Sequence, residues 1–487
     1  MNILLIFTST VAISSALIPF PPEPARVLPD LNGTAFAPYR LVFQPGECTG
    51  DDGRLSPVPG GPSPFGGSTL IDINKNCFSC FRIPTFIAGQ TPGVIHAFAE
   101  GRRGELTDRS KQYTGSGAGG CPDGPDTRLV YKRSTTNGAS WSSVRTFLQH
   151  SERAENGLCQ SRASPVIDPV TKTLFVGFIN NGPGCQAKTL GGPHEATPML
   201  VKSMNDGLTW SAPYNLMLNT GPGKPPVPVS AASHFAIGPT KGLTVKRPDG
   251  SVRLMLPGEA DWSASVFSDD HGRTWQSNAL NRSYTLSPGE MDWTICSNGT
   301  ACPPGMKFMM VNRAAGRNCP TMCVQFSADG VVWGRQMATD NGNLVVGRGH
   351  AKPGVVAVPG AFISSQTLDL CPVGQKMNPD MSCGTPGSPN HTERQPSDVL
   401  GDGMTLMVSR DGVKWTLFKK TWPIGGMYTT AAGLTFDDEG AALTYGVVFA
   451  AGSLPLSRTG TIYFMNFTAV HPNGTMDAEL AAALAKL

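Results

Sequence analysis

The sequence predicts an all-β protein built as a six-bladed β-propeller, and three observations lead to this fold class. A short motif recurs along the chain, short apolar runs alternate with turn-forming residues, and the periodicity of an amphipathic helix is nearly absent before the C-terminal end. The chain has 487 residues, of which 57 are Gly and 42 are Pro, so turns are frequent. Many short strands joined by turns are typical of sandwiches, barrels and propellers, and the repeat favours the propeller.

The recurring motif has the pattern Ser-x-Asp-x-Gly-x-Thr-Trp. Its clearest copy is SDDHGRTW at 268–275. Looser copies are STTNGASW at 134–141 and SMNDGLTW at 203–210, and shortened copies are SADGVVW at 327–333 and SRDGVKW at 409–415. Successive copies begin 59 to 82 residues apart, which is the length of one blade with its loops. Five copies predict at least five blades, and a degenerate sixth completes the propeller.

The residue types of the motif favour a hairpin turn. Ser and Asp side chains bond to local backbone amides, Gly adopts a positive φ, and the Trp folds back as an apolar plug. The strands are expected in short apolar runs, and the proline in the first of them favours the edge of a sheet. These runs cover 83–87, 94–99, 129–131, 174–179, 307–311 and 461–465.

The two ends of the chain differ from the repetitive part. Residues 1–16 contain an apolar stretch and end on small residues, which is typical of a signal peptide, although the stretch is preceded by no Lys or Arg. We expect a Pro/Gly-rich arm over 17–68, the propeller over 69–470, and a tail with a short amphipathic helix over 471–487. Asn-x-Ser/Thr acceptors favour export and predict a glycoprotein; they are Asn32, Asn281, Asn298, Asn390, Asn466 and Asn473.

The charge balance and the cysteines exclude several function classes. With 39 Lys and Arg against 36 Asp and Glu, the net charge of +3 is too even for a nucleic-acid-binding surface. After the signal we find no apolar run long enough to span a membrane. The 12 cysteines favour structural disulfides, with their pairings left open. Cys77 and Cys80 have no second matching pair, so we predict neither a metal nor another cofactor.

Two further motifs precede the first copy of the repeat, FRIP at 81–84 and AFAEGR at 97–102. Together with the repeat, which is similar to the Asp-box, they resemble the sialidases (neuraminidases), and the resemblance covers roughly 76–468. In that family the arginine of the first motif is one of three that bind the carboxylate of sialic acid. The resemblance therefore implies this role for Arg82 and places Arg102 in the same pocket.

Three arginines suit such a substrate because a planar guanidinium donates paired hydrogen bonds to a carboxylate. The resemblance implies that Arg394, ahead of the fifth copy of the motif, is the third of them. For the second, Arg313 and Arg317 both lie between the third and fourth copies, and the sequence does not separate them.

The resemblance also implies which residues carry the chemistry. Tyr428, in GGMYTT, matches the family's nucleophile, and Glu290, after the third copy, matches the base that takes its proton. A neutral phenol suits this substrate because a carboxylate nucleophile would repel the carboxylate of the sugar. Asp123 is the expected general acid/base shortly before the first copy, with Asp126 and Asp108 as weaker candidates.

One position departs from the family, because Ala450 stands where many sialidases carry a glutamate that supports the first arginine. The resemblance implies an exo-α-sialidase, secreted or lumenal (endolysosomal or extracellular), that hydrolyses terminal sialic acid through a tyrosyl-enzyme intermediate and retains the anomeric configuration. The expected partners are sialylated glycoproteins, glycolipids or oligosaccharides. Two alternatives stay open, a catalytically idle sialic-acid-binding propeller and a trans-sialidase.

Overall fold

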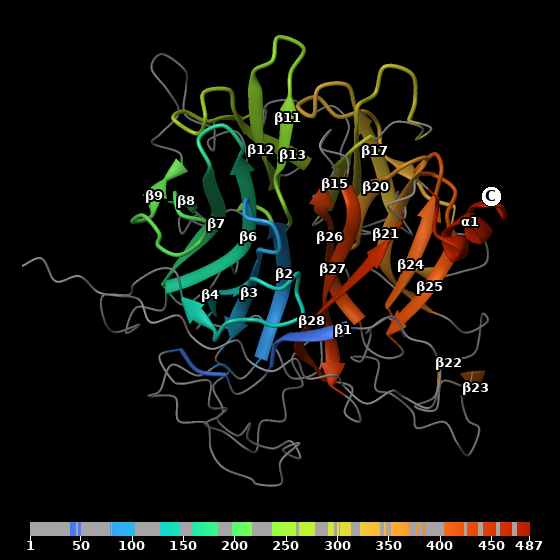
Figure 1. Ribbon diagram of the computed structural model, residues 1–487, viewed down its shortest axis with the longest axis horizontal. Coiled ribbons are helices and arrows are strands. Elements are labelled where there is room, and N and C mark those ends of the chain that lie inside the picture. The colour runs from blue at the N-terminus through green and yellow to red at the C-terminus, as the bar shows by residue number, and fades with distance from the viewer. Residues whose placement is uncertain are drawn as a thin grey trace, which may run out of the picture.

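The predicted six-bladed β-propeller is confirmed by the computed structural model. Among the described residues, the strands form six antiparallel sheets of four or five strands and a two-stranded hairpin, accompanied by one short helix. The six sheets stand around a common axis as blades (Figure 1). The described ranges are 39–44, 47–49, 78, 80–102, 127–146, 158–183, 197–216, 236–259, 263–277, 291–296, 300, 302–312, 322–340, 345–346, 352–369, 376–377, 383–384, 404–422, 426–436, 442–453, 458–469 and 475–487.

The first three blades follow the order of the chain from their inner to their outer strands. Blade 1 consists of β2 (Cys80–Ala88), β3 (Ile95–Arg102), β4 (Thr127–Ser134) and β5 (Arg145–Thr146). Blade 2 consists of β6 (Leu158–Asp168), β7 (Thr173–Pro183), β8 (Thr197–Ser203) and β9 (Tyr214–Asn215). Blade 3 consists of β10 (Ala236–Ile237), β11 (Leu243–Lys246), β12 (Val252–Glu259), β13 (Ser263–Ser268) and β14 (Gln276–Ser277).

The remaining blades complete the circle, and the last one also uses a strand from the N-terminal arm. Blade 4 consists of β15 (Met291–Ile295), β16 (Phe308–Asn312), β17 (Cys323–Ser327) and β18 (Met337–Ala338). Blade 5 consists of β19 (Val345–Val346), β20 (Gly354–Val358), β21 (Ala361–Asp369), β24 (Met404–Ser409) and β25 (Thr416–Trp422). Blade 6 consists of β26 (Gly426–Phe436), β27 (Ala442–Ser453), β28 (Arg458–Thr468) and β1 (Tyr39–Phe43). The hairpin of β22 (Lys376–Met377) and β23 (Cys383–Gly384) lies outside the blades.

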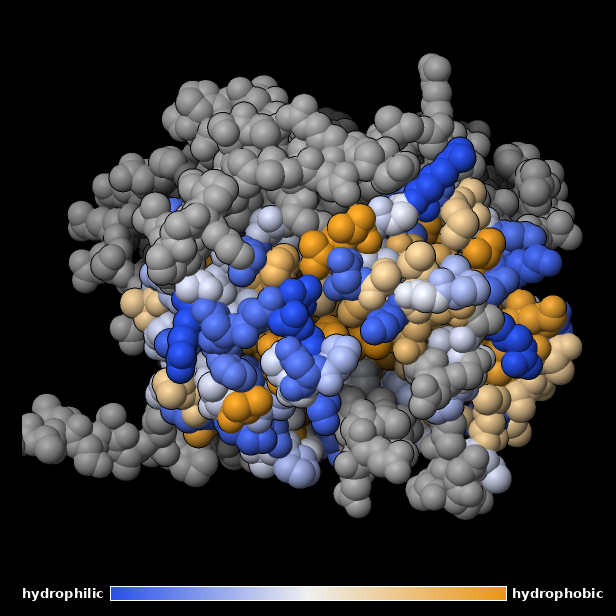
Figure 2. Space-filling view, turned by 90° about the horizontal axis from the view of Figure 1, so that it is seen from above, coloured by the Kyte–Doolittle hydropathy of each residue, from blue (hydrophilic) through white to orange (hydrophobic). Residues whose placement is uncertain are grey.

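The five copies of the sequence motif form turns between the last two strands of blades 1 to 5, as predicted; we call them the motif turns. In each one, the serine Oγ accepts a hydrogen bond from the glycine N–H at 2.8–2.9 Å. The tryptophan is buried in four of the five copies, Trp141, Trp275, Trp333 and Trp415. The motif turns lie on the same face as the loop between β11 and β12, which is at the top of Figure 1, and Figure 2 views the molecule from above, where hydrophilic residues and small hydrophobic patches are interspersed.

The glycine of each motif turn also lets its blade pack closely against the preceding one. All five glycines have φ between 72° and 82°, a conformation that side chains disfavour. A Cβ at any of them would lie only 2.2–2.5 Å from a side-chain atom of the preceding blade. For Gly138 of blade 1 that atom belongs to Phe464 of blade 6, so the first and last blades pack together through the same kind of glycine contact.

A buried polar chain adds a second contact between blades 1 and 2. His96 Nε2 lies 2.8 Å from Asp206 Oδ1, and His96 Nδ1 lies 2.9 Å from the Tyr131 hydroxyl. Burial lowers the pKa of His96, although Asp206 acts to raise it, so the imidazole is neutral at pH 7. The neutral ring then donates from Nε2 to Asp206 and accepts the Tyr131 proton at Nδ1.

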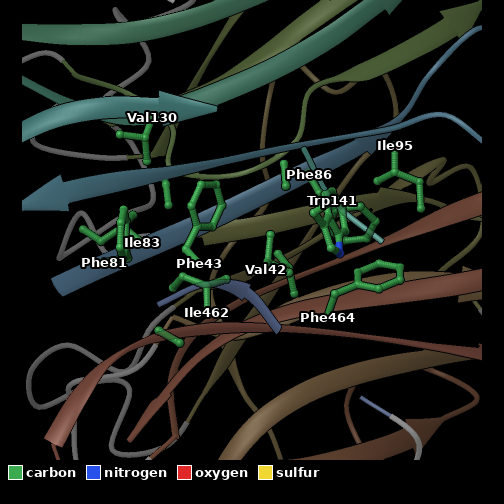
Figure 3. Packing of buried hydrophobic residues seen from close by; sticks show 14 of the residues in the cluster. Val42, Phe43, Phe81, Ile83, Phe86, Ile95, Val130, Trp141, Ile462 and Phe464 are labelled. Atoms are coloured by element: carbon green, nitrogen blue, oxygen red, sulfur yellow. The ribbon is translucent and has the colours of Figure 1, made fainter. Parts of the chain in front are cut away.

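The strand β1 closes the propeller from the outside. It pairs antiparallel with β28, and its residues Val42 and Phe43 are buried in the core between blades 1 and 6 (Figure 3). In the same core the ring of Phe464 packs edge-on against Phe86 and Trp141, each at a centroid distance of 5.6 Å. The Pro/Gly-rich arm thus contributes a strand, Tyr39–Phe43, that lies outside the apolar runs predicted to form strands.

The remaining expectations about the fold concern the C-terminal helix, the cysteines and the membrane. The expected helix is α1 (Ala478–Leu484), and the Asp477 side chain caps it by accepting from two backbone N–H groups. Cys296 and Cys302 form a disulfide within the hairpin between β15 and β16, as the cysteine count led us to expect. The one helix of the described residues, α1, lacks the length and apolarity that a membrane crossing requires.

Candidate active site

Three of the residues implicated by the sequence lie among the described residues: Arg82, Arg102 and Tyr428. They lie in β2, β3 and β26, at the ends of these strands away from the motif turns, which are the lower ends in Figure 1. The other candidates, Asp123, Glu290, Arg313, Arg317 and Arg394, lie outside the described residues, as do Asp108 and Asp126. Their roles stay predictions.

Arg82 is held next to a β-bulge in the inner strand of blade 1. Arg82 is opposite Glu100 and Thr85 is opposite Phe98, so two residues of β2 face one residue of β3. The extra residues are Ile83, whose φ is 53°, and Pro84, which has no N–H to donate. Pro84 thus lies at a bulge in an edge strand, as expected of proline. The FRIP motif therefore encodes the bulge that sets the position of the arginine.

Glu100 is a further residue of the site, and no sequence motif pointed to its role. Its Oε2 accepts hydrogen bonds from Arg102 Nη2 at 2.6 Å and from Arg102 Nε at 3.1 Å, and both residues are buried. Its Oε1 accepts from the backbone N–H of Arg162 in blade 2 at 3.2 Å. Because Glu100 is two residues from Arg102 and opposite Arg82, all three side chains emerge on the same face of the sheet.

Tyr428 also lies in a bulge, in the inner strand of blade 6. Gly426 is opposite Ala451 and Thr429 is opposite Phe449, which leaves two residues of β26 facing Ala450 alone. Ala450 is fully buried and belongs to the same apolar cluster as Tyr428. The position where the family's glutamate was expected therefore fills an apolar space beside the tyrosine.

The structure brings Arg82 and Tyr428 into contact. The Arg82 Cζ lies 5.3 Å from the centroid of the Tyr428 ring, within the range of a cation–π interaction. Both residues are 5% exposed. Their positions in the chain are distant, so the contact exists only because blades 1 and 6 are neighbours in the closed propeller.

Hydrogen bonds between the two inner strands maintain this contact. Thr430 Oγ1 donates to the Pro84 carbonyl at 3.2 Å, which ties the strand of Tyr428 to the bulge of Arg82. Lys352, which is fully buried, donates from Nζ to the Thr429 carbonyl at 2.6 Å and to Thr430 Oγ1 at 3.2 Å. The residues on both sides of the Arg82–Tyr428 contact are therefore held by side-chain hydrogen bonds to backbone carbonyls as well as by packing.

Within the described residues there is no group of three or more His, Cys, Asp or Glu side chains arranged to hold a metal ion. The polar groups assembled here are two arginines, a carboxylate and a phenol. Such a set can bind an anionic group and place a hydroxyl nucleophile beside it.

A scan against protein-family models finds no match. Solved structures match over most of the chain at low sequence identity. A sialidase from Trypanosoma rangeli in complex with sialic acid is 14% identical with a TM-score of 0.52, and the match covers 88% of this chain and 58% of that one. A Hadza microbial sialidase is 18% identical with a TM-score of 0.50 and coverages of 80% and 66%. The intramolecular trans-sialidase of Ruminococcus gnavus is 12% identical with a TM-score of 0.52 and coverages of 80% and 95%.

The protein is thus a six-bladed β-propeller in which bulges in two inner strands bring Arg82 and Tyr428 together. Among the known propellers, the chain has the fold of the sialidases and trans-sialidases. It spans roughly three fifths to two thirds of the length of the two sialidases above.

Proposed function

We propose that this chain is a retaining exo-α-sialidase that is secreted and removes terminal sialic acid from glycoproteins, glycolipids or oligosaccharides. The observation that carries the proposal is the contact between Arg82 and Tyr428. A guanidinium that binds the carboxylate of sialic acid would hold the anomeric carbon, which bears that carboxylate, next to the phenol. The fold shared with sialidases supports the same assignment.

In the first half of the proposed reaction, the Tyr428 oxygen attacks the anomeric carbon and its proton passes to Glu290. The bond from the anomeric carbon to the glycosidic oxygen breaks as Asp123 protonates that oxygen, and the remaining glycan leaves as an alcohol. The sugar is then linked to the tyrosine.

In the second half, Asp123 takes a proton from water, and the water oxygen attacks the anomeric carbon. The bond to the Tyr428 oxygen breaks, and the phenol recovers its proton from Glu290. Two inversions at one carbon give net retention.

Glu100 is proposed to do the work of the missing family glutamate. It lies opposite Arg82 in the neighbouring strand and already binds Arg102. A carboxylate that supports the two arginines keeps their guanidinium planes oriented and offsets part of their charge when no substrate is bound. The Ala450 position is then free to pack against Tyr428.

The experiment that tests the function is the release of 4-methylumbelliferone from its α-sialoside, with the first product followed by proton NMR. A retaining sialidase releases α-sialic acid, which afterwards converts to the β anomer. An initial β product would contradict the tyrosyl-enzyme mechanism, and the absence of any turnover would contradict the assignment as a hydrolase.

A trans-sialidase is the second candidate, because matching structures include intramolecular trans-sialidases from Ruminococcus gnavus and leech. The same NMR experiment separates the two. Free sialic acid indicates hydrolysis, whereas 2,7-anhydro-sialic acid or a sialylated acceptor sugar indicates transfer. An idle sialic-acid-binding propeller would bind the sialoside and release no product.

A further inference from the structure

A buried carboxylate connects four blades near the inner strands. Asp292, in β15 of blade 4, is 0% exposed. Its Oδ1 accepts hydrogen bonds from Lys241 Nζ at 2.7 Å and from Thr240 Oγ1 at 2.5 Å, both in blade 3. Its Oδ2 accepts from the backbone N–H of Val355 in blade 5 at 2.8 Å and from that of Ala431 in blade 6 at 3.4 Å.

Lys241 supplies the positive charge that pairs with Asp292. Lys241 is buried, and its Nζ donates to the Val355 carbonyl at 2.9 Å as well as to Asp292. The Trp293 indole N–H donates in turn to the Lys241 carbonyl at 2.7 Å. Buried ion pairs of this kind gain little stability over well-packed apolar residues, because desolvation offsets the attraction. Stability alone therefore gives no reason for the pair.

One member of the junction, Ala431, lies in the same strand as Tyr428 and close to it. The backbones of β20 and β26 approach so closely that a Cβ on Gly354 would be 2.9 Å from the Ala431 nitrogen. Asp292 Oδ2 bonds to both strands at that point. Towards Tyr428, the next bond is from the Thr429 N–H to the Lys352 carbonyl at 3.1 Å. The backbone of β26 is thus held at Ala431 by Asp292 and at Thr429 by the Lys352 carbonyl, next to Tyr428. A shift of the Asp292 carboxylate would therefore also shift Tyr428.

We propose that Asp292 is a positioning residue for Tyr428. Its carboxylate, neutralised by Lys241, holds β26 at a fixed place against β15 and β20 and so keeps the phenol beside Arg82. The inference rests on the proposed function of Tyr428 as the nucleophile. It gives the buried ion pair a role that stability alone does not.

The test compares Asp292→Glu with a matched control, Asp269→Glu. The substitution Asp292→Glu keeps the charge opposite Lys241 but moves the carboxylate by one methylene relative to Val355 and Ala431. Asp269 also pairs with a cationic side chain, accepting two hydrogen bonds from Arg253 at 2.7 and 2.8 Å, but it lies in a motif turn on the opposite face. The kcat and KM for the 4-methylumbelliferyl sialoside are measured at a temperature where near-UV circular dichroism shows every variant to be folded.

We expect Asp292→Glu to lower kcat by about 10- to 100-fold with a much smaller change in KM, since a misplacement of about 1 Å costs up to about 100-fold in rate. The control should keep the kcat of the original chain. The double variant Asp292→Asn/Lys241→Met keeps an oxygen for the Val355 N–H without a buried charge, so its kcat should return to within about threefold of the original. Should Asp292→Glu not fold, Asp292→Leu/Lys241→Met takes its place and is expected to show the same loss of kcat.

A folded Asp292→Glu variant with unchanged kcat would overturn the inference while leaving the proposed function intact. A loss of kcat in Asp292→Asn/Lys241→Met as large as that in Asp292→Glu would also overturn it, because the bridging oxygen would then not suffice. If the original chain has no turnover at all, the proposed function fails and this inference fails with it. The two failures are therefore distinguishable by the original chain alone.

Discussion

The motif-turn glycines allow the contacts between blades to be tested directly, and Gly138→Ala is the sharpest case. Gly138 has φ +81°, where an L residue costs about 1–2 kcal/mol. The added Cβ would also lie 2.2 Å from Cε1 of Phe464, an aromatic carbon in the core between blades 6 and 1. Forcing a methyl group into a packed core costs typically about 1–3 kcal/mol more. We therefore expect the free energy of unfolding to fall by about 2–4 kcal/mol, after the small gain from a stiffer unfolded chain.

Gly250→Ala provides the matched control for this prediction. Gly250 has φ +84°, nearly the same conformation, but no atom lies within 4 Å of the position of its Cβ. Its substitution should cost only about 1 kcal/mol, the conformational part alone. The assay is urea unfolding followed by tryptophan fluorescence, with the midpoint and slope compared between variants. In a Phe464→Leu background, the cost of Gly138→Ala should fall to that of Gly250→Ala. Equal losses for Gly138→Ala and Gly250→Ala in the original chain would refute the role of the motif glycine in joining the blades.

Three further predictions concern the polar residues. Burial acts to raise the pKa of Asp206, but hydrogen bonds from His96 and backbone N–H groups outweigh it and hold the pKa below its usual range. The ionised Asp206 side chain therefore stabilises the fold fully above about pH 4, and this stabilisation declines as the pH falls further. Asp206→Asn should therefore lower the free energy of unfolding more at pH 7 than at pH 3 in urea titrations, and an equal loss at both would contradict this. Arg82→Lys should raise KM for the sialoside by roughly tenfold or more, since one ammonium cannot donate the paired hydrogen bonds of a guanidinium, and an unchanged KM would assign the carboxylate to other arginines. Glu100→Gln should also raise KM, less than Arg82→Lys does, because Arg102 loses its charged partner; a lowered KM would show that Glu100 repels the substrate instead.

The fold could be predicted from the sequence because each motif turn is determined locally. Ser, Asp and Gly in SDDHGRTW make their hydrogen bonds within a few residues, so related residues give a similar turn in blades 1 to 5. The contribution of Tyr39–Phe43 to blade 6 has no such local signal. Its pairing with β28 is decided by the ends of the chain meeting when the circle of blades closes, which no short window of sequence contains.

The part of the candidate site that lies in sequence motifs or follows from strand alternation could be predicted. FRIP and the setting of Tyr428 indicated two residues that the structure brings into contact. Alternation in β3 could also have identified Glu100, which is two residues before Arg102 and so emerges on the same face. The junction at Asp292 could not be read from the sequence, because the donors to its carboxylate come from three other blades and include two backbone N–H groups.

The turnover of the 4-methylumbelliferyl sialoside by Tyr428→Phe tests whether this tyrosine is the nucleophile. The matched control is Tyr445→Phe, a buried tyrosine of β27 that packs on Phe467 in another apolar cluster. We expect Tyr428→Phe to lose at least about 1,000-fold in kcat while it still binds the sialoside, since the tyrosine oxygen forms the bond to the sugar. Tyr445→Phe should keep the kcat of the original chain. A Tyr428→Phe variant that turns over the sialoside as fast as the original chain would show that Tyr428 is not the nucleophile.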